Sequence, residues 1–250
     1  MLIIIPAYNE QDALGGVLRE IQSLDVRDLE IVVVDDGSSD RTAEVAHAAG
    51  ARVLRLCRNL GIGGAVQSGL RLARREGFEC AVQIDGDGQH PPHELHRLLA
   101  AARGPDGPDL IVGTRYGNRE ASAEADQIRF RSTVMRRVGS WWLRWILRAI
   151  TGVPVTDPTS GFRLYGARAL ALFDETYPYD FPEPESLAIA RVAGLRITEV
   201  PVTMRERQGG TSSISSMSAP YYMLKVTFAI LLTYLRARRR PKQREIESDT

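Results

Sequence analysis

Two carboxylates alternate with two glycines in Asp85-Gly86-Asp87-Gly88, directly after a short and mostly apolar run, 81–84. Glycine frees the backbone, so acids one residue apart can turn their oxygens toward one point. Clustered carboxylate oxygens suit a hard divalent cation such as Mg²⁺ or Mn²⁺. A plain turn at a strand end uses the same residue types. This stretch alone does not separate the two interpretations, and the rest of the chain has to decide.

A second group of acids follows another apolar run, 32–34, in Asp35-Asp36-Gly37-Ser38-Ser39-Asp40. Ser39 or Asp40 can cap the helix that is predicted to follow, and a capped turn is one interpretation of the segment. Asp35, however, comes before the cap position, at the strand edge, where the fold does not require an acid. We expect its carboxylate to accept hydrogen bonds from a nucleobase or a ribose.

A third loop, Asn59–Gly64, precedes a predicted helix and contains three glycines. The start of a helix presents backbone amides to an anion, so this loop is a candidate phosphate contact. It lacks the Gly-Lys-Ser/Thr of a P-loop and the GxGxxG fingerprint, so it is weak evidence by itself.

The first half of the chain alternates apolar runs with segments of helical period. Strands are expected at 2–5, 30–34, 53–56, 81–84 and 110–112, and helices at 11–23, 39–49, 63–75 and 92–102. This alternation predicts βαβ units and an α/β fold with a mostly parallel sheet. Ligands bind beyond the carboxyl ends of such strands, where the three polar loops described above and the loop 6–10 lie.

The second half is less regular. A polar segment, 115–126, precedes a predicted helix, 131–150, with three tryptophans and several arginines. A polar loop, 156–163, leads to a short helix near 168–173, and a helix at 185–193 precedes a strand at 196–202. A Gly- and Ser-rich connection, 209–218, is followed by an apolar segment, 219–235. We therefore expect one domain over 1–208 and an appendage over 209–250.

Composition narrows the class of protein. With 250 residues the chain can bury a substantial core, and its formal net charge of +1 gives no general attraction to nucleic acid, which we do not expect as a partner. Cys57 and Cys80 fall in apparent strands, so buried thiols are expected rather than a disulfide. The sequence begins directly with a strand, so a secretory signal is not expected and the catalytic part should face the cytoplasm.

Five motifs carry a resemblance to a known family. In chain order they are Ile5–Glu10, Val34–Asp40, Asp85–Pro92, Thr156–Arg163 and Met204–Ser213. Together they resemble the nucleotide-sugar-binding domain of the family 2 glycosyltransferases, which has the GT-A fold. Asp85-Gly-Asp-Gly-Gln-His-Pro-Pro92 is particularly similar to the dolichol-phosphate mannosyltransferase and polyprenyl-phosphate glycosyltransferase branch. The resemblance covers about residues 1–215.

The resemblance implies a role for each donor-side position. It implies that the nucleotide pocket is lined by Pro6, Tyr8, Glu10 and Asp35. It also implies that the metal on the donor's pyrophosphate is held by Asp85, Asp87 and Gln89. We count Gly37, Asn59 and Gly61 among the donor-binding positions. A cation is needed because the leaving nucleoside diphosphate develops negative charge, and Arg205 and Arg207 are candidate supplementary cations.

The acceptor side needs a separate argument. A hydroxyl acceptor must lose its proton to a general base, whereas the phosphate acceptor of the polyprenyl-phosphate branch is already an anion. Asp157, Glu183 and Glu185 are the acids in plausible loops, and with Asp87 and Arg205 they form the predicted catalytic set. Glu183 and Glu185 fit equally well as acids that complement the start of a helix. The chain lacks a Gln-x-x-Arg-Trp motif, which disfavours a processive synthase.

Two segments suggest contact with a membrane. The helix 131–150 suits an interfacial helix whose arginines meet lipid phosphates, although an ordinary packed helix with a solvated basic face is the alternative. The run 219–235 has only 17 residues, includes Lys225, and is short for crossing a bilayer. Basic residues at 236–242 would hold that end on the cytoplasmic surface. Monotopic attachment, or docking on a small membrane partner protein, is therefore favoured over a span.

The sequence thus predicts a GT-A, metal-dependent glycosyltransferase with a membrane-associating helical tail. It would move a sugar from a nucleoside-diphosphate sugar to a polyprenyl phosphate at the cytoplasmic membrane face. Three alternatives stay open at this point: the same fold acting on a saccharide or other hydroxyl acceptor, a non-catalytic nucleotide-sugar-binding protein, and a nucleotidyltransferase.

Overall fold

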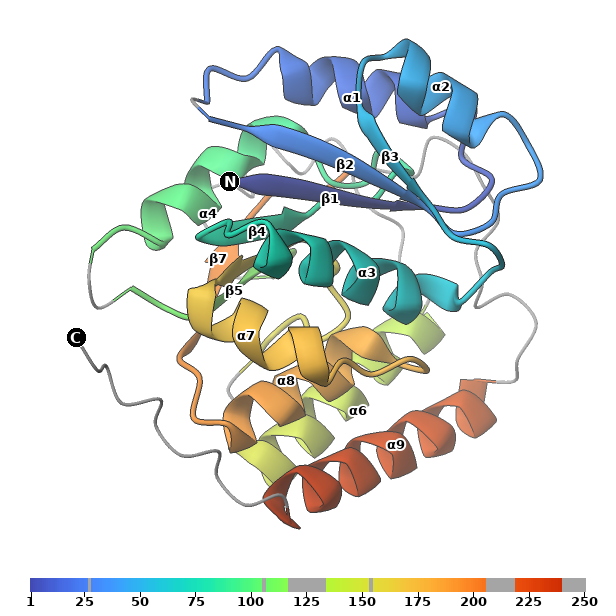
Figure 1. Ribbon diagram of the computed structural model, residues 1–250. Helices are drawn as coiled ribbons and strands as arrows, with labels where there is room; N and C mark the ends of the chain where they lie inside the picture. Colours follow the sequence, from blue (N-terminus) through green and yellow to red (C-terminus); the bar gives the residue numbers. More distant parts are fainter. Residues whose placement is uncertain (27, 105–106, 117–133, 153–154, 206–218, 240–250) are drawn as a thin grey trace.

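A computed structural model describes residues 1–26, 28–104, 107–116, 134–152, 155–205 and 219–239 (Figure 1). Seven strands form one sheet in the order β3-β2-β1-β4-β6-β5-β7. The strands are β1 Leu2–Ala7, β2 Glu30–Asp35, β3 Arg52–Arg55, β4 Cys80–Gln83, β5 Leu110–Thr114, β6 Arg163–Gly166 and β7 Ile197–Pro201. The helices are α1 Leu14–Gln22, α2 Thr42–Ala48, α3 Gly61–Arg75, the 3₁₀ turn η1 Pro92–Glu94, α4 Leu95–Ala101, α6 Val134–Thr151, α7 Ala167–Glu175, α8 Pro182–Val192 and α9 Ala219–Arg239.

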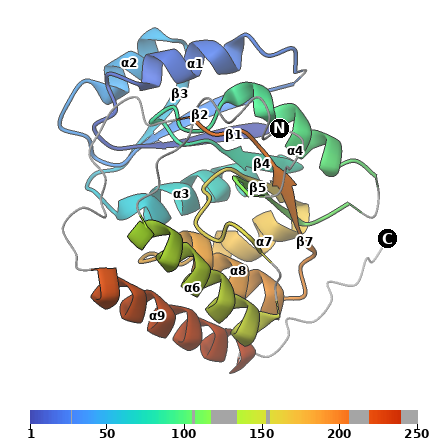
Figure 2. The same ribbon diagram turned by 180° about the vertical axis from the view of Figure 1, so that it is seen from behind.

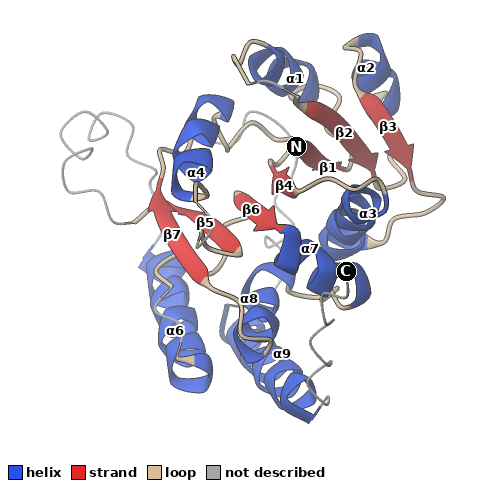
Figure 3. Cartoon of the chain, turned by 60° about the vertical axis from the view of Figure 1, so that its left-hand side comes forward, coloured by secondary structure: helices blue, strands red, loops and turns tan. Residues whose placement is uncertain are grey.

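The central strands are apolar because both faces of the sheet are covered. In β1 every residue from Leu2 to Ala7 is buried, which is the pattern of a strand inside a parallel sheet. Ile3 and Ile5 pack into one core with residues of α1 and α4, and Leu2 and Ile4 pack into the other core. Figure 3 shows α1, α2 and α4 on one side of the sheet and α3, α7 and α8 on the other.

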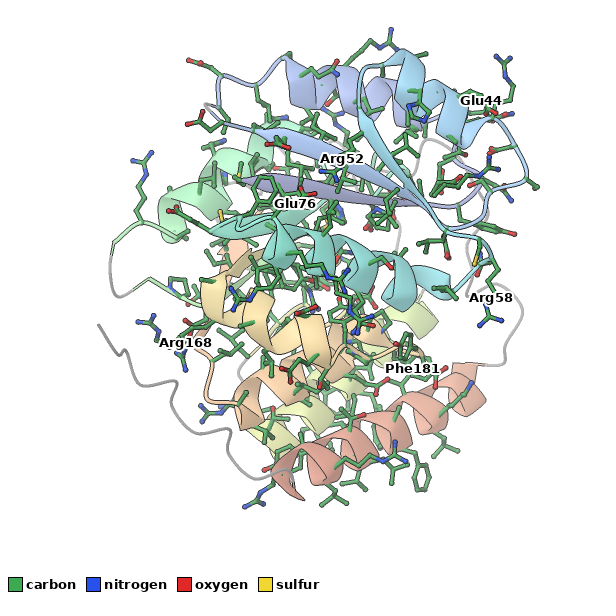
Figure 4. The ribbon with its side chains drawn as sticks, in the orientation of Figure 1. Glu44, Arg52, Arg58, Glu76, Arg168 and Phe181 are labelled. Atoms are coloured by element: carbon green, nitrogen blue, oxygen red, sulfur yellow. The ribbon has the colours of Figure 1, made fainter. Side chains whose placement is uncertain are left out.

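The closest approach of a helix to the sheet depends on one glycine. Gly69 of α3 faces Ile4, and a Cβ atom at Gly69 would lie 2.3 Å from Cγ2 of Ile4. Only a residue without a side chain lets α3 approach β1 this closely. The ion pair of Arg52 with Glu76 at 2.6 Å joins β3 to the residue that follows α3 (Figure 4).

The predicted mostly parallel α/β sheet with flanking helices is confirmed, but one strand is missing from the prediction. Residues 156–163 were expected to be a loop leading into a short helix, whereas Arg163–Gly166 is β6, antiparallel to both β4 and β5. Two features of this strand prevent its prediction from the sequence. It has four residues, and it begins with an arginine whose side chain is fully buried, so no run of apolar residues marks it.

Smaller differences concern the ends of elements and the thiols. The expected helix 92–102 is the turn η1 followed by α4, because Pro92 begins it with a tighter turn. The expectation of two buried thiols was wrong: Cys57 follows β3 and is exposed, and Cys80 is only partly buried. Most of the polar segment 115–126, and residues 131–133 of the predicted helix 131–150, lie outside the described residues.

The helices α6 and α9 lie side by side and pack beneath α8 (Figure 2). Val226 and Ile230 of α9 are fully buried in the same core as Leu187 of α8, and burial of each contributes about 1.5–3 kcal/mol. Nε1 of Trp142 in α6 donates to Oγ1 of Thr227 in α9 at 3.1 Å. The proposed boundary between 1–208 and 209–250 falls in 206–218, outside the described residues.

Within the described part of the chain, no helix combines the length and the apolar character that crossing a bilayer requires.

Candidate functional site

The polar loops meet at one edge of the sheet. β1, β2 and β4 are parallel and end at this edge, on the right in Figure 1, with the residues Ala7, Asp35 and Gln83. β6 runs the opposite way, so its first residue, Arg163, pairs with Gln83 there, and Val112 of β5 pairs with Arg163. The loops after β1, β2, β4 and β5, and the loop before β6, therefore share one edge.

The loops after β1 and β2 are joined by hydrogen bonds. The backbone N–H of Asn9 donates to Oγ of Ser38 at 3.0 Å, and Oδ1 of Asn9 accepts from the N–H of Ser39 at 2.9 Å. Asn9 has a φ of 55°, which Asn tolerates better than most residues. Pro6 is buried in β1, while Tyr8 is 49% exposed beside this junction. The N–H of Glu10 donates to Oγ1 of Thr42 at 2.9 Å.

Asp35 has one buried carboxylate oxygen that accepts no hydrogen bond among the described residues. Its side chain is fully buried, and Oδ1 accepts from the N–H of Ser38 at 2.9 Å. Oδ2 lies 3.2 Å from Nε of Arg55 in an ion pair, yet it accepts no hydrogen bond among the residues that the structure describes. A buried carboxylate oxygen without a hydrogen bond is costly. An incoming N–H or O–H would satisfy it.

The neighbouring acid, Asp36, binds the start of α3. Its two oxygens accept from the N–H groups of Leu60 at 2.7 Å and Gly61 at 2.8 Å, so it caps the start of α3. Burial raises the pKa of Asp36, and the charge of Asp35 adds to the shift, while the two amide bonds oppose it. Oδ1 of Asn59 also accepts from Gly61, at 3.0 Å. A phosphate would have to displace Asp36 to reach these two amides.

Gly37, between these acids and Ser38, lies against the loop that precedes α3. Its φ is +71°, and a Cβ atom there would lie 2.9 Å from the backbone of Arg58 and of Asn59. The requirement for glycine is therefore set by the close approach of two backbones.

Asp85 is held by three neighbours. Nε2 of Gln83 donates to Oδ1 of Asp85 at 3.2 Å, and the N–H of Asp85 donates to Nδ1 of His90 at 3.2 Å. The His90 ring is buried and stacks on Phe162 with centroids 5.3 Å apart. A Cβ atom at Gly161 would lie 3.0 Å from both carboxylate oxygens of Asp85. The orientation of this carboxylate is thus fixed from several sides.

Asp87 and Gln89 form a tight turn next to it. Asp87 is 2% exposed, and its Oδ1 accepts from the N–H of Gln89 at 2.9 Å. The carbonyl oxygen of Gln89 accepts from the N–H of Arg205 at 3.0 Å, which brings the segment after β7 beside this loop. Arg205 directs its side chain to Glu20 of α1, at 2.8 Å, and Arg207 lies outside the described residues.

The donor set fits a divalent cation that also takes ligands from a substrate. Among the described residues, no three His, Cys, Asp or Glu side chains are grouped so that they could hold a metal by themselves. Mg²⁺ is usually bound by one or two carboxylates together with substrate phosphates and water. Asp85 and Asp87, with the amide oxygen of Gln89, have the chemistry for that kind of site.

On the other side of the edge, Asp157 is engaged in a buried ion pair. Arg115, which follows β5, donates from Nε to Oδ2 and from Nη2 to Oδ1 of Asp157, each at 2.7 Å. Burial lowers the pKa of the Arg115 guanidinium, but the bonds and charge of Asp157 outweigh this effect and raise it. The N–H of Asp157 donates to Glu199 of β7 at 2.8 Å. Asp157 therefore fastens the loop before β6 to the neighbouring strands.

The two glutamates at the start of α8 differ. Glu185 is buried, accepts from the N–H of Phe181 at 3.1 Å, and accepts from Oγ1 of Thr233 in α9 at 2.5 Å. Phe181, labelled in Figure 4, also lies beneath Nζ of Lys225, 5.6 Å from its ring centroid. Glu183 is partly buried, and burial raises its pKa; the nearby Asp85 adds to the shift and Arg163 opposes it.

Arg163 connects α8 to the loop before β6. Its guanidinium is fully buried and donates to the carbonyl oxygen of Ser160 at 2.8 Å, to Oγ of Ser186 at 2.7 Å, and to the carbonyl oxygen of Glu183 at 2.9 Å. Sequence reasoning did not single out Gln83, Asp36 or Arg115, which bind the predicted site residues directly. Asp36 and Arg115 are polar side chains that follow predicted strands, which is a local signal, whereas no local pattern marks Gln83.

Comparisons with known proteins identify the family of the chain. Residues 2–170 match the family model described as glycosyl transferase family 2. The chain is 34% identical over 226 residues to an undecaprenyl-phosphate mannosyltransferase of Micrococcus luteus, covering 86% of this chain and 87% of that protein. It is 31% identical to a polyprenol monophosphomannose synthase of Mycolicibacterium smegmatis, covering 90% and 84% of the two chains.

A solved structure has a similar fold. The glucosyl-3-phosphoglycerate synthase of Mycobacterium tuberculosis, in a complex with Mn²⁺, UDP and phosphoglyceric acid, superimposes with a TM-score of 0.65 at 21% identity. The match covers 96% of this chain and 78% of that one, and it shows a shared GT-A fold. The family match and the two relatives establish that the chain belongs to glycosyl transferase family 2 and is a glycosyltransferase.

Proposed function

We propose that the protein transfers a sugar from a nucleoside-diphosphate sugar to a polyprenyl phosphate with the help of a divalent cation. The observation that carries the proposal is the grouping at one sheet edge of Asp35, whose buried Oδ2 has an ion pair with Arg55 but accepts no hydrogen bond among the described residues, and the loop acids Asp85 and Asp87. The mannosyltransferase and mannose synthase relatives support the acceptor, because their names specify polyprenyl-type lipids.

The nucleoside and the diphosphate of the donor each have a suitable group in the chain. Oδ2 of Asp35 is the acceptor for an N–H or O–H of the nucleoside. Asp85, Asp87 and Gln89 would hold Mg²⁺ or Mn²⁺ against the diphosphate, where the cation stabilises the charge that develops on the leaving group. Because the turn at Asp87 and the bonds at Asp85 already exist, these carboxylates need little rearrangement to act.

Two of the acids proposed for the acceptor side are already engaged by other side chains, which agrees with a phosphate acceptor. Asp157 is tied to Arg115 and Glu185 to Thr233, so neither presents an unengaged carboxylate. An acceptor that is already an anion needs no general base. Transfer then requires the phosphate oxygen to attack the sugar carbon while the nucleoside diphosphate leaves, without proton removal by the enzyme.

The paired helices α6 and α9 offer a surface for the lipid. Their exposed side chains include Trp141 at 59%, Trp145 at 55%, Leu224 at 59% and Phe228 at 61%. Arg144, Arg148 and Lys225 lie among them. Large apolar side chains interleaved with cations are typical of helices that lie in the interface of a membrane. We infer peripheral or monotopic attachment at the cytoplasmic face, with docking on a membrane partner protein as the other outcome to be tested.

A hydroxyl acceptor is the second candidate, and one observation favours it. Glu183 is the acid whose pKa is raised beside Asp85, and a general base works best when its pKa approaches the working pH. With a hydroxyl acceptor, the transfer rate should rise with pH through a single ionisation, and Glu183→Gln should abolish transfer. A rate that keeps its value in Glu183→Gln supports the phosphate acceptor.

The first test is a thermal-shift screen of nucleoside diphosphates and nucleotide sugars, with and without Mn²⁺. We expect one nucleotide to stabilise the protein, and to do so only when Mn²⁺ is present. A ligand at 100 times its Kd raises stability by about 2.7 kcal/mol. Equal stabilisation with Mn²⁺ and with excess EDTA would contradict a metal-bridged diphosphate. Asp87→Asn should lose the Mn²⁺-dependent stabilisation, and Asp174→Asn, on α7, is the control for a carboxylate outside the proposed metal site.

A further inference from the structure

A buried chain of polar side chains leads from β6 to the predicted metal loop. The hydroxyl of Tyr165 in β6 donates to Oε1 of Gln83 in β4 at 3.1 Å, and Nε2 of Gln83 donates to Oδ1 of Asp85 at 3.2 Å. Tyr165 is fully buried and Gln83 is 1% exposed. Because water does not reach Gln83, its amide has to be satisfied by these two neighbours.

The pairing of the two strands explains why these side chains meet. β4 and β6 are antiparallel, with Gln83 opposite Arg163 and Ala81 opposite Tyr165. Residues two apart on a strand point to the same face, so Gln83 and Tyr165 are diagonal neighbours there. An aromatic side chain reaches across this diagonal, which places the Tyr165 hydroxyl at the Gln83 amide.

A second tyrosine extends this chain. The hydroxyl of Tyr177 lies 3.3 Å from that of Tyr165, both are buried, and either hydroxyl can be the donor. When Tyr177 donates to Tyr165, the proton of Tyr165 is left for Oε1 of Gln83. Nε2 of Gln83 then faces Asp85, where a donor is needed, because the flipped amide would set an oxygen against the carboxylate.

Gly161 lies against both the carboxylate of Asp85 and the amide of Gln83. A Cβ atom there would lie 3.0 Å from both oxygens of Asp85 and from Nε2 of Gln83. The absence of a side chain at Gly161 thus leaves room for the hydrogen bond between Gln83 and Asp85. The loop before β6 and the strand β6 itself both contact this pair of side chains.

We infer that Gln83 is a positioning residue for the metal-binding carboxylate of Asp85, held in its working orientation by Tyr165 and Tyr177. The inference rests on the proposed metal site and adds residues that do not touch the cation. A carboxylate that binds a metal is usually oriented by a hydrogen bond of this kind, and loss of the partner weakens metal binding or activity.

The test is Gln83→Met, which keeps the volume of the side chain and removes both hydrogen bonds. Mn²⁺ is titrated against the protein with UDP and, separately, with GDP, and free Mn²⁺ is followed by electron paramagnetic resonance. We expect Mn²⁺ to bind about 10–100-fold more weakly than to the wild type. Tyr165→Phe should change binding in the same direction by a smaller factor, because it releases the amide without removing it.

Gln67→Met is the matched control. Gln67 is also a buried glutamine, at 4% exposure, that accepts from a tyrosine hydroxyl, Tyr179, at 3.0 Å and donates to a carbonyl oxygen, that of Asp174, at 3.3 Å. Its replacement removes the same two kinds of bond at a place far from Asp85 in the sequence. Thermal stability should fall in both variants, whereas Mn²⁺ binding should change only in Gln83→Met.

A kinetic measurement separates positioning from general damage. In Gln83→Met, the Mn²⁺ concentration that gives half of the maximal transfer rate should rise, and kcat should recover at saturating Mn²⁺. Unchanged Mn²⁺ binding in Gln83→Met and Tyr165→Phe would overturn the inference, and Tyr165→Phe alone decides if Gln83→Met does not fold. Failure of the wild-type chain to bind Mn²⁺ with either nucleotide would overturn the metal site itself, so the two failures are distinguishable.

Discussion

We call the loops after β1, β2 and β4 the donor side of the proposed site, and the loops after β5 and before β6, with the start of α8, its acceptor side. The two sides are held together in different ways. On the donor side, the loops after β1, β2 and β4 are fixed mainly by backbone N–H groups that donate to short polar side chains, as Ser38 does to Asp35 and Gln89 to Asp87. On the acceptor side, the contacts are made by long side chains from distant segments, as in Arg115 with Asp157 and Glu185 with Thr233.

The two sides should respond differently to changes in α9. On the donor side, several contacts join residues two or three positions apart, and the orientation of Asp85 depends in addition on Gln83 and Tyr165. The acceptor side depends on the packing of α8 and α9, and α9 carries the exposed apolar surface. We therefore expect donor binding to be insensitive to changes in α9, and acceptor use to be sensitive to them.

The largest expected effect is on the donor side, in Asp87→Asn. The amide keeps an oxygen for the N–H of Gln89 but loses the charge that would hold the cation. Loss of several kcal/mol of charge stabilisation corresponds to a fall in transfer rate of about 10³-fold or more, with little change in Tm. The rate of labelled-sugar transfer measures it, and wild-type activity in this variant would refute the metal role of Asp87.

The next effect is on stability, on the acceptor side. Asp157 is 1% exposed, and removal of one partner of a buried ion pair costs about 3–5 kcal/mol. We expect Asp157→Ala to lower the free energy of unfolding by that amount in urea titrations. The double variant with Arg115→Ala should lose less than the sum of the two single losses. A stable Asp157→Ala protein with a collapsed kcat would instead indicate a general base.

A smaller effect distinguishes the two neighbouring acids of the donor side. Asp36→Ala removes the cap of α3 and should cost about 1–2 kcal/mol of stability, as the loss of a helix cap does. Asp35→Asn should leave stability unchanged and weaken nucleotide binding in the thermal-shift screen. The reverse pattern would mean that the roles of these acids are exchanged.

The smallest effect is a dependence of stability on pH at Glu183. Its pKa in the folded protein is raised above the ordinary value of 4.5, so the fold favours the protonated form. Stability from this group is present below pH 4.5 and is lost as pH rises through the folded pKa. Glu183→Gln should therefore raise Tm at pH 7 and leave it unchanged at pH 4. A fall in Tm at pH 7 would contradict the burial of an ionised carboxyl.

The sequence predicted the strands of the first half better than β6, and the contacts explain why. The strands β1, β2 and β4 are mostly apolar runs followed by polar loops, so they can be predicted from local pattern. β6 could not be found in this way, because its pairing with β4 is set 80 residues along the chain and its Arg163 is buried among carbonyl oxygens.

The partners of the site residues were also beyond local pattern. Gln83 has the same apolar neighbours as an ordinary strand residue, and only the position of Tyr165 shows what it binds. Glu185 has the spacing of an acid at a helix start, yet its second oxygen binds Thr233, 48 residues away. Hydrogen bonds between side chains far apart in the sequence depend on tertiary packing, which cannot be predicted from periodicity or motif spacing.

The most direct test of the account is transfer of labelled sugar into undecaprenyl phosphate in anionic lipid vesicles. A panel of UDP- and GDP-linked sugars is tested with Mn²⁺, with excess EDTA, and with a soluble saccharide in place of the lipid phosphate. We predict that one donor yields a labelled lipid, that EDTA abolishes the product, and that Asp87→Asn does the same. Labelled saccharide with no labelled lipid, or full transfer in EDTA, would contradict it.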